Sequence, residues 1–273
     1  MRGATRLWTT LAGASVALGA WTAAPGPAGA APTAGPHWGS AKTAKVHPGI
    51  AIDIASVKCV VGFVLTDGTR AFLAIPASCT GVSSGQPTDG CSEAQVPVGL
   101  PVTVPGAKYK GRLVYSSFTQ MQLTGDSHAN RCAANNMSLI RLDYRDIRRT
   151  NPSVPALGGP TGLATTAPAQ GDQLHAYIKT TATAVAMQPQ QAGWAEQILP
   201  ATQVASSDVG SPVLTAAGRA VGMVSVVQQF QGGPALVSRL DHELSYLRSV
   251  PRFRHVHLAK GTAPFLAPAG GLL

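Results

Sequence analysis

The chain has 273 residues, of which only 12% are charged, and it contains 30 glycines and 21 prolines and carries a formal net charge of +9. This composition disfavours a mainly helical protein and favours many short strands joined by turns. Because the sequence has no lysine and arginine run interleaved with aromatic residues, nucleic acid is a poor candidate for a partner. The positive charge instead favours acidic surfaces such as cell-wall polymers or anionic lipids, or it forms a solvated basic surface with no specific partner.

Residues 1–30 have the pattern of a secretory signal peptide. A short basic start precedes the apolar run Leu7–Ala24, and Ala28-Gly29-Ala30 fits the small-x-small cleavage rule. An uncleaved membrane anchor is the alternative, but the run is richer in Ala, Gly and Thr than in Leu and Ile. We therefore expect an exported protein, extracellular or associated with the cell envelope, with no stable membrane span after cleavage.

A leader rich in Pro, Gly and Ala follows over residues 31–47 and is expected to be flexible. Two apolar runs then flank Asp67-Gly68, which is a strong hairpin signal, and two more flank Ala217-Gly218. Further strands are expected within residues 96–104, 109–117, 135–143, 171–179, 181–189 and 193–201. The Pro- and Gly-rich stretch 151–160 is the expected junction between two lobes.

The folded domain is expected to span residues 48–250, with lobes at about 48–150 and 155–250. Its last element is a short amphipathic helix within residues 238–250, because Leu240, Leu244 and Leu247 fall on one helical face. The tail 251–273 is basic and then rich in Ala, Pro and Gly, and we expect it to be poorly ordered.

The four cysteines are Cys59, Cys79, Cys91 and Cys132. An even number in an exported chain suggests two disulfides, and three pairings are possible on the sequence alone. We choose the nearest-neighbour pairing, Cys59–Cys79 and Cys91–Cys132. A metal site is not expected, because no CxxC or HxxxH cluster is present, and no cofactor is implied.

Three segments together resemble the secreted bacterial trypsin-like serine proteases, which have the chymotrypsin fold. They are CVVGFVLTDGTRAFLAIPASCTG, CAANNMSLIRLD and SSDVGSPVL, and they occur in the family's order within about Val46 to Val250. The resemblance implies an all-β protein with two antiparallel β-barrel lobes of chymotrypsin type and a short C-terminal helix.

The resemblance places the family's general-base histidine at Ser78, its orienting aspartate at Asn136 and its nucleophilic serine at Val209. Acyl transfer needs a nucleophile, a base and a group that orients the base. Valine has no nucleophilic atom, a serine hydroxyl is not a base near neutral pH, and asparagine cannot stabilise an imidazolium. Since loss of a triad costs about a millionfold in turnover, the resemblance implies a protease scaffold without useful protease activity.

The same motif places an oxyanion-hole donor at Ser207, where a side chain disfavours the conformation that turns the amide inward. Asp208 and Gly210 match the family's neighbours of the nucleophile. We expect a hydrogen-bond or ion-pair partner for Asp208, since a buried carboxylate without one is costly; a turn-forming aspartate is the alternative. Ser225 and Val226 match the strand that pairs with substrate, so this edge could accept an extended peptide. Alternatively, the valines of this strand fill the core.

A relocated active site would need another serine and histidine. Ser206, Ser207 and Ser211 lie near the Val209 position, and the histidines of the domain core are His128, His175 and His242. Surface or packing roles are the favoured interpretation of each histidine. We therefore expect a monomeric, catalytically inactive homologue that binds peptide, protein or cell-envelope material. The alternative is an active serine endopeptidase with a relocated nucleophile and base.

Overall fold

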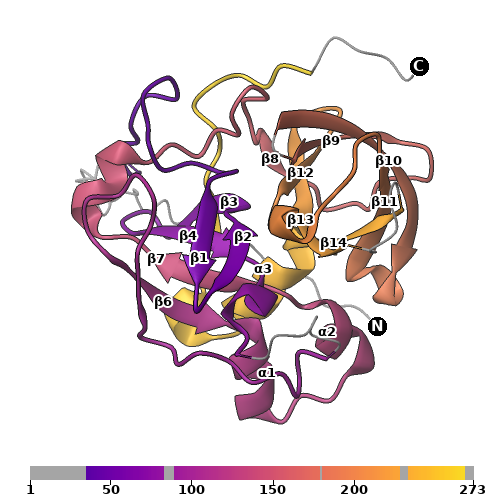
Figure 1. The fold of residues 1–273 in the computed structure, drawn as a ribbon, viewed down its shortest axis with the longest axis horizontal. Coiled ribbons are helices and arrows are strands. Elements are labelled where there is room, and N and C mark those ends of the chain that lie inside the picture. Colours follow the sequence, from indigo (N-terminus) through magenta and orange to yellow (C-terminus); the bar gives the residue numbers. More distant parts are fainter. Residues whose placement is uncertain (1–34, 83–88, 179, 228–232, 268–273) are drawn as a thin grey trace, which may run out of the picture. The chain divides into compact units, whose positions relative to one another are not determined.

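The computed structural model describes residues 35–82, 89–178, 180–227 and 233–267, without the side chains of residues 180, 226 and 227. The predicted signal peptide lies outside the described residues. The described chain forms two lobes of mainly antiparallel strands (Figure 1), which confirms the expected all-β class.

The first lobe is built on a six-stranded sheet with the order β15-β3-β4-β7-β6-β5. Its strands are β3 (Phe63–Thr66), β4 (Ala71–Ile75), β5 (Pro101–Val102), β6 (Gly111–Ser116), β7 (Ser138–Arg141) and β15 (His257–Leu258). The predicted hairpin at Asp67-Gly68 joins β3 to β4. One carboxylate oxygen of Asp67 accepts the Thr69 and Arg70 amides at 3.0 and 2.8 Å, and Gly68 has φ +96°, so both residues of the signal shape the turn.

A separate hairpin of β1 (Ala51–Ile54) and β2 (Val57–Val60) covers one face of this sheet. Its residues alternate, so that Ile52 and Ile54 are buried between exposed neighbours. They pack with Leu73, Leu113 and Ile140 of the sheet, and this contact forms the core of the first lobe.

The second lobe is a closed six-stranded barrel. Its strands are β9 (Gln173–Ile178), β10 (Thr180–Gln190), β11 (Ala195–Pro200), β12 (Pro212–Thr215), β13 (Arg219–Val227) and β14 (Ala235–Arg239). They follow the order β12-β9-β10-β11-β14-β13, and a further pairing of β12 with β13 closes the ring. Strand β8 (Gly162–Leu163) pairs in parallel with β13, so the chain enters the second lobe just after the predicted junction at residues 151–160.

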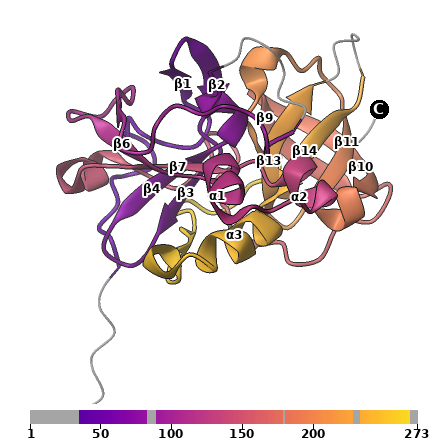
Figure 2. The ribbon, with the colours of Figure 1, turned by 90° about the horizontal axis from the view of Figure 1, so that it is seen from below.

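The predicted C-terminal helix is α3 (Leu240–Arg248). Its Leu240, Leu244 and Leu247 are fully buried, as the periodicity predicts. They pack in a cluster that contains Phe63 and Leu65 of the first lobe and Leu214 of the second. Helix α3 therefore joins the two lobes, and Figure 2 shows it on the side where the lobes meet.

Two helices of the first lobe were not predicted. Helix α1 (Ser117–Thr124) begins after Ser116, whose hydroxyl accepts the Thr119 amide at 3.5 Å, and ends at Gly125 with φ +64°. Helix α2 (Ala129–Ala134) follows it. Helix α2 packs against η3 (Gln191–Gly193), a 3₁₀ turn of the second lobe, and so makes another contact between the lobes.

The leader and the tail differ from the prediction over the residues that the structure describes. In the leader, Val46 is fully buried, and the amides of Gly39 and Lys45 donate to the carbonyls of Thr150 and Arg149. In the tail, β15 pairs with β3, and the ring of Phe253 packs on Phe72 and Tyr115. The expectation of disorder was wrong because these polar and Gly/Pro-rich segments supply a few buried apolar side chains and many backbone hydrogen bonds.

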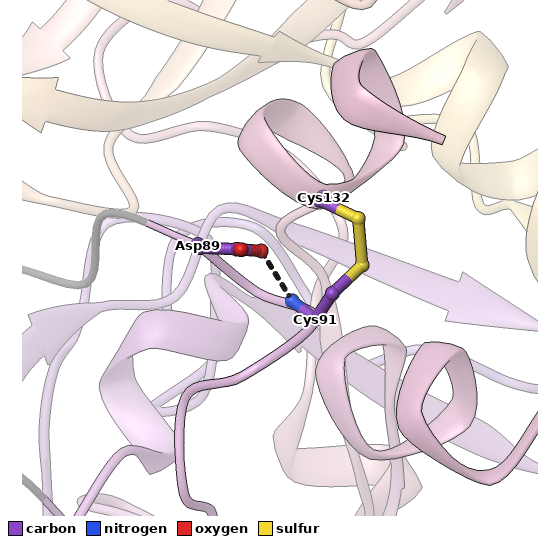
Figure 3. A group of neighbouring side chains, drawn as sticks. All are labelled: Asp89, Cys91 and Cys132. Atoms are coloured by element: carbon purple, nitrogen blue, oxygen red, sulfur yellow. Dashed lines mark hydrogen bonds between the residues drawn. A yellow bond between two sulfur atoms is a disulfide. The ribbon is translucent and has the colours of Figure 1, made fainter. Parts of the chain in front are cut away.

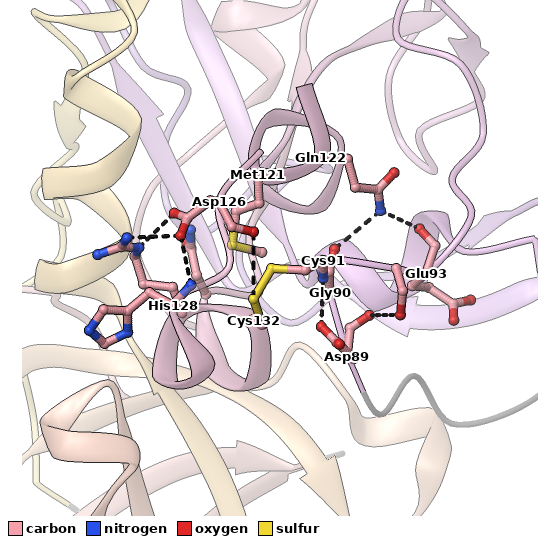
Figure 4. Close-up of a disulfide and its surroundings, with 12 residues drawn as sticks. Asp89, Gly90, Cys91, Glu93, Met121, Gln122, Asp126, His128 and Cys132 are labelled. Carbon is pink, nitrogen blue, oxygen red and sulfur yellow. Dashed lines mark hydrogen bonds and ion pairs between the residues drawn. A yellow bond between two sulfur atoms is a disulfide. The ribbon is translucent and has the colours of Figure 1, made fainter. Parts of the chain in front are cut away.

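Both predicted disulfides are confirmed, Cys59–Cys79 with 20 residues of separation and Cys91–Cys132 with 41. The second ties α2 to a loop that Gln122 of α1 also holds, through hydrogen bonds to the carbonyls of Gly90 and Glu93 (Figure 4). In the described part of the chain, none of the helices has the length and apolar character needed to span a bilayer.

Candidate functional site

Ser78, the predicted base position, lies in the 3₁₀ turn η1 (Ala77–Thr80) directly after β4. Two restraints hold this turn. Cys79 is bonded to Cys59 of β2, and the Thr80 hydroxyl donates to the Ala77 carbonyl at 2.7 Å. The half-buried Ser78 side chain is therefore presented by a rigid turn rather than by a free loop.

Asn136 lies just before β7 and contacts Ser78 directly. The Asn136 Oδ1 accepts the Ser78 backbone amide at 2.8 Å, and the Asn136 Nδ2 donates to the Ser78 Oγ at 3.3 Å. The Asn136 carbonyl also accepts the Ala77 amide at 3.1 Å. An amide side chain fits this place because it offers both a donor and an acceptor. Two of the three predicted triad positions are thus brought together as a pair whose polar groups satisfy each other.

A buried acid that sequence reasoning missed lies behind this pair. Glu243 of α3 is fully buried, and its Oε1 accepts the Asn136 backbone amide at 3.1 Å. Burial raises the pKa of Glu243 to about 8, so the carboxyl is mostly protonated at neutral pH. Its position on the apolar face of the predicted helix, three residues after Leu240, is the signal that could have found it.

Val209, the predicted nucleophile position, follows the 3₁₀ turn η4 (Ser206–Asp208). Its side chain is only 7% exposed and lies in the core cluster that contains Cys59 and Cys79. Its carbonyl accepts the Val60 amide at 2.8 Å. Val209 therefore serves as a packing residue where the second lobe meets the first.

The predicted oxyanion-hole position, Ser207, lies inside the 3₁₀ turn η4 just before Val209. The Val209 amide donates to the Ser206 carbonyl at 3.3 Å inside the turn, so this donor is already used. Ser207 is exposed within the same turn and is not in the left-handed region of φ. An oxyanion hole needs preorganised amides directed at one point. This turn directs the Val209 amide back into the chain, and a donor role of Ser207 stays a prediction.

The two neighbours of Val209 hold the turn in place. The Asp208 Oδ2 accepts the Ala205 amide at 2.7 Å, so this buried carboxylate has a hydrogen-bond partner within its own turn, as the turn-forming alternative also expects. Gly210 has φ +102°, and a Cβ there would lie 1.9 Å from the Val60 carbonyl oxygen. Only glycine fits this close approach of the two lobes.

The predicted groove residues lie on β13 at a bulge between Val224 and Val226. The Ser225 hydroxyl donates to the Leu236 carbonyl of β14 at 3.2 Å, so it supports the barrel. Val224 is fully buried in the barrel core, as the alternative interpretation expects. The side chain of Val226 lies outside the described residues, and a peptide-binding role of this edge stays a prediction.

The three histidines show no relocated active site in the part of the chain that the structure describes. His128 is exposed at the start of α2, and His242 stacks on Trp194 with 5.1 Å between ring centroids. His175 is buried beside Phe265, and burial lowers its pKa. Within the described chain, none of the three is hydrogen-bonded to a serine, and Ser211 is completely buried.

One group of potential metal ligands lies near the second disulfide. The ligand atoms of Asp89, Cys91 and Cys132 lie within 4.8 Å of one another. Both sulfurs are joined in the disulfide, and the Asp89 carboxylate accepts the Cys91 amide at 2.8 Å (Figure 3). A metal prefers deprotonated thiolates, which a disulfide cannot supply, so this group is a structural one.

No family model and no curated protein matches the chain. Among solved structures, the chain is similar to a glutamic acid-specific serine protease, with a TM-score of 0.50, 15% identity, and coverage of 78% of this chain and 100% of the other. For Thermobifida fusca Protease A the TM-score is 0.49 and the sequence identity 15%, and the match covers 79% of this chain and 99% of the other. For Cellulomonas bogoriensis chymotrypsin the TM-score is 0.48 and the sequence identity 13%, and the match covers 78% of this chain and 98% of the other. The glutamic acid-specific serine protease supports the fold assignment, an all-β protein of chymotrypsin type with two lobes, of which the second is a closed barrel.

Proposed function

We propose that the chain is a secreted, catalytically inactive homologue of trypsin-like serine proteases that acts by binding peptide, protein or cell-envelope material. One observation carries this proposal, namely that none of the three triad positions holds a free reactive group. Ser78 and Asn136 are hydrogen-bonded as a pair, and Val209 is packed in the core. The two disulfides are consistent with an exported protein.

The chemistry of acyl transfer supports the same conclusion. The reaction needs an oxygen nucleophile that a base can deprotonate, and the Val209 side chain has no such atom. It also needs donors for the oxyanion, which are worth about 100-fold to 1000-fold each in turnover. The Val209 amide is used by Ser206 within η4. Binding remains as the function that this scaffold can perform.

The test is labelling of the purified mature protein with a fluorophosphonate, alongside hydrolysis of casein. We expect no labelling and no hydrolysis above a heat-treated control. Labelling of the parent protein at any serine would overturn the proposal, and mapping the modified residue would identify the nucleophile.

Restored variants measure how far the scaffold is from activity. The triple variant Ser78→His, Asn136→Asp, Val209→Ser restores the family's residues but keeps the η4 turn. Adding Ser207→Gly frees the backbone of that turn, so we expect the quadruple variant to label about 100-fold faster than the triple one. Equal labelling rates of the two variants would show that the turn does not limit the oxyanion hole.

A further inference from the structure

The fold gathers cations from three separate segments onto one surface of the first lobe. Lys108 and Lys110 precede β6, Arg112 lies in it, Arg141 ends β7, and Arg148 lies in the 3₁₀ helix η2 (Tyr144–Arg149). Each of these side chains is exposed. Strands β6 and β7 are neighbours, and the Arg149 side chain of η2 donates to the Gly106 carbonyl at 3.1 Å, which brings η2 against the loop before β6.

Two of these arginines face each other across the strand pair. Arg112 and Arg141 are register partners in β6 and β7. Like charges directly opposite each other destabilise a strand pair. Neither guanidinium forms an ion pair in the described chain, where the Arg112 Nη1 donates to the Gly99 carbonyl at 3.0 Å. An external anion between them would remove the repulsion.

The nearby carboxylates do not neutralise the surface, because each is already hydrogen-bonded to another partner. Asp146 is buried, and its two oxygens accept the Lys108 and Tyr109 amides at 2.8 Å each. Asp143 is held by a two-pronged contact with Arg145, at 2.8 and 2.9 Å. The acids therefore shape the loop and η2, while the charges of the surrounding lysines and arginines remain available to a partner.

Aromatic rings lie among the cations. The Arg145 guanidinium lies 3.4 Å from the centroid of the Tyr109 ring, and Tyr144 beside it is 78% exposed. An exposed ring among cations offers a face for stacking and a rim for anions. The sequence shows only the fragments Lys108-Tyr109-Lys110 and Tyr144-Arg145, and the fold brings them together.

We propose that this basic surface, defined by Lys108, Lys110, Arg112, Arg141, Tyr144 and Arg148, binds a phosphodiester-linked polymer of sugars or polyols. The inference deepens the binding part of the proposed function. Guanidinium groups match the geometry of phosphate oxygens and bind them with two parallel hydrogen bonds. Sugar rings or polyol chains between the phosphates would pass over the face of Tyr144.

The polymer is favoured over two other polyanions. A lipid surface would be met by several exposed aliphatic side chains, but in the described chain only Val98, beside the Gly99 that Arg112 contacts, lies near this surface. The others are Val82, Leu123, Leu199 and Leu266, in other segments. Disulfides belong to an oxidising, exported compartment, where anionic glycans and polyols rather than nucleic acids are the expected polyanions.

The basic surface lies apart from the protease-like site. In Figures 1 and 2, η2 is the pink coil at the end of the first lobe that faces away from the second lobe. Ser78 and Val209 instead lie where the lobes meet. Polymer binding and the absence of protease activity can therefore be tested separately on one preparation.

The experiment measures binding of the mature protein to poly(glycerol phosphate) chains by calorimetry between 50 and 200 mM salt. Arg141→Glu combined with Arg148→Glu is expected to weaken binding at least about tenfold at low salt. It should also lower the slope of log K against log salt concentration by about 1.5, because fewer phosphate contacts release fewer counterions on binding. The matched control is Lys58→Glu with Arg254→Glu, which changes the net charge equally at exposed cations outside this surface. We expect the control to change affinity less than about threefold.

A second variant tests the aromatic ring. Tyr144→Ala is expected to weaken polymer binding several-fold and to leave the salt slope unchanged, because stacking releases no counterions. Equal losses in the two double variants would overturn the proposal, since net charge alone would then explain binding. Tighter binding to a single-stranded oligonucleotide or to anionic phosphatidylglycerol vesicles than to the polymer would also overturn it.

Fluorophosphonate labelling of the same preparation separates the two proposals. A protein that is labelled and still binds the polymer contradicts the inactive site but not this surface. A protein that is not labelled and does not bind the polymer contradicts the proposed role of this surface but not the proposed loss of catalysis.

Discussion

The two lobes reach a folded state by different means. The second lobe closes its sheet into a ring, so its strands are all paired with neighbours. The first lobe has an open sheet order, very short edge strands, and both disulfides of the chain. It also carries the basic surface. The lobe with the less complete sheet therefore depends on disulfides and on contacts with distant parts of the chain.

The largest effect is expected at the joint between the lobes. Gly210→Ala places a Cβ 1.9 Å from the Val60 carbonyl oxygen at φ +102°, so we expect a loss of at least about 4 kcal/mol in the free energy of unfolding. Gly68→Ala is the matched control within the first lobe. Gly68 has φ +96° with open space around its Cβ, so only the conformational penalty of about 1–2 kcal/mol applies. Urea unfolding compares them, and similar losses would show that the joint is not tightly packed.

The next effect separates the two disulfides. The chain-entropy model gives about 3 kcal/mol for the 20-residue separation of Cys59–Cys79 and about 4 kcal/mol for the 41-residue separation of Cys91–Cys132. Cys59 and Cys79 are both buried in the first core, whereas Cys91 is half-buried. We therefore expect replacement of Cys59 and Cys79 by alanine to cost more than the model gives. If the Cys91–Cys132 replacement costs more, loop entropy alone determines the order.

The smallest of the three effects is a pH dependence from buried acids. The folded pKa of Glu243 is about 8, well above the unfolded value near 4.3, so the folded state binds more protons between these values. Stability is then lost as the pH rises from about 4 to about 8. Glu243→Gln keeps an acceptor for the Asn136 amide and removes this loss. Relative to the parent, the variant should gain about 3 kcal/mol between pH 5 and 8.

Glu196 of the second barrel is the matched control for that experiment. Burial also raises the pKa of Glu196, but the nearby charge of Arg239 opposes the shift. Glu196→Gln should therefore show a smaller gain over the same pH range in the same urea titration. If the free energy of unfolding of Glu243→Gln differs from that of the parent by the same amount at pH 5 and at pH 8, the assignment of a protonated Glu243 is contradicted.

The sequence predicted those features that depend on local chemistry. The Asp67-Gly68 turn, the leucine face of α3 and the nearest-neighbour disulfides are all present as expected. Helices α1 and α2 were missed because they are short and lack an apolar stripe, although Ser116 and Gly125 mark the ends of α1. The prediction of a flexible leader and a poorly ordered tail was wrong because both segments are held by partners more than a hundred residues away. The side chain of Asn151, for example, donates to Gly39 and to Thr262.

For the candidate site, motif matching named positions but not their contacts. It brought out Ser78 and Asn136, and the structure adds that they bind each other. It could not show that the Val209 amide is used within its own turn or that Glu243 lies behind Asn136, because both depend on backbone placement. The basic surface was missed for a similar reason, since its parts are far apart in the sequence.

The return of the chain end to the first lobe has a consequence for biosynthesis. Strand β15 is the edge partner of β3, and Phe253 fills the core beside Phe72, yet about 180 residues separate these partners. A ribosome delivers the chain from its N-terminus. The first lobe therefore leaves the ribosome first but completes its sheet last, after the second lobe has been synthesised. During that interval the open edge of β3 is exposed to chaperones and proteases.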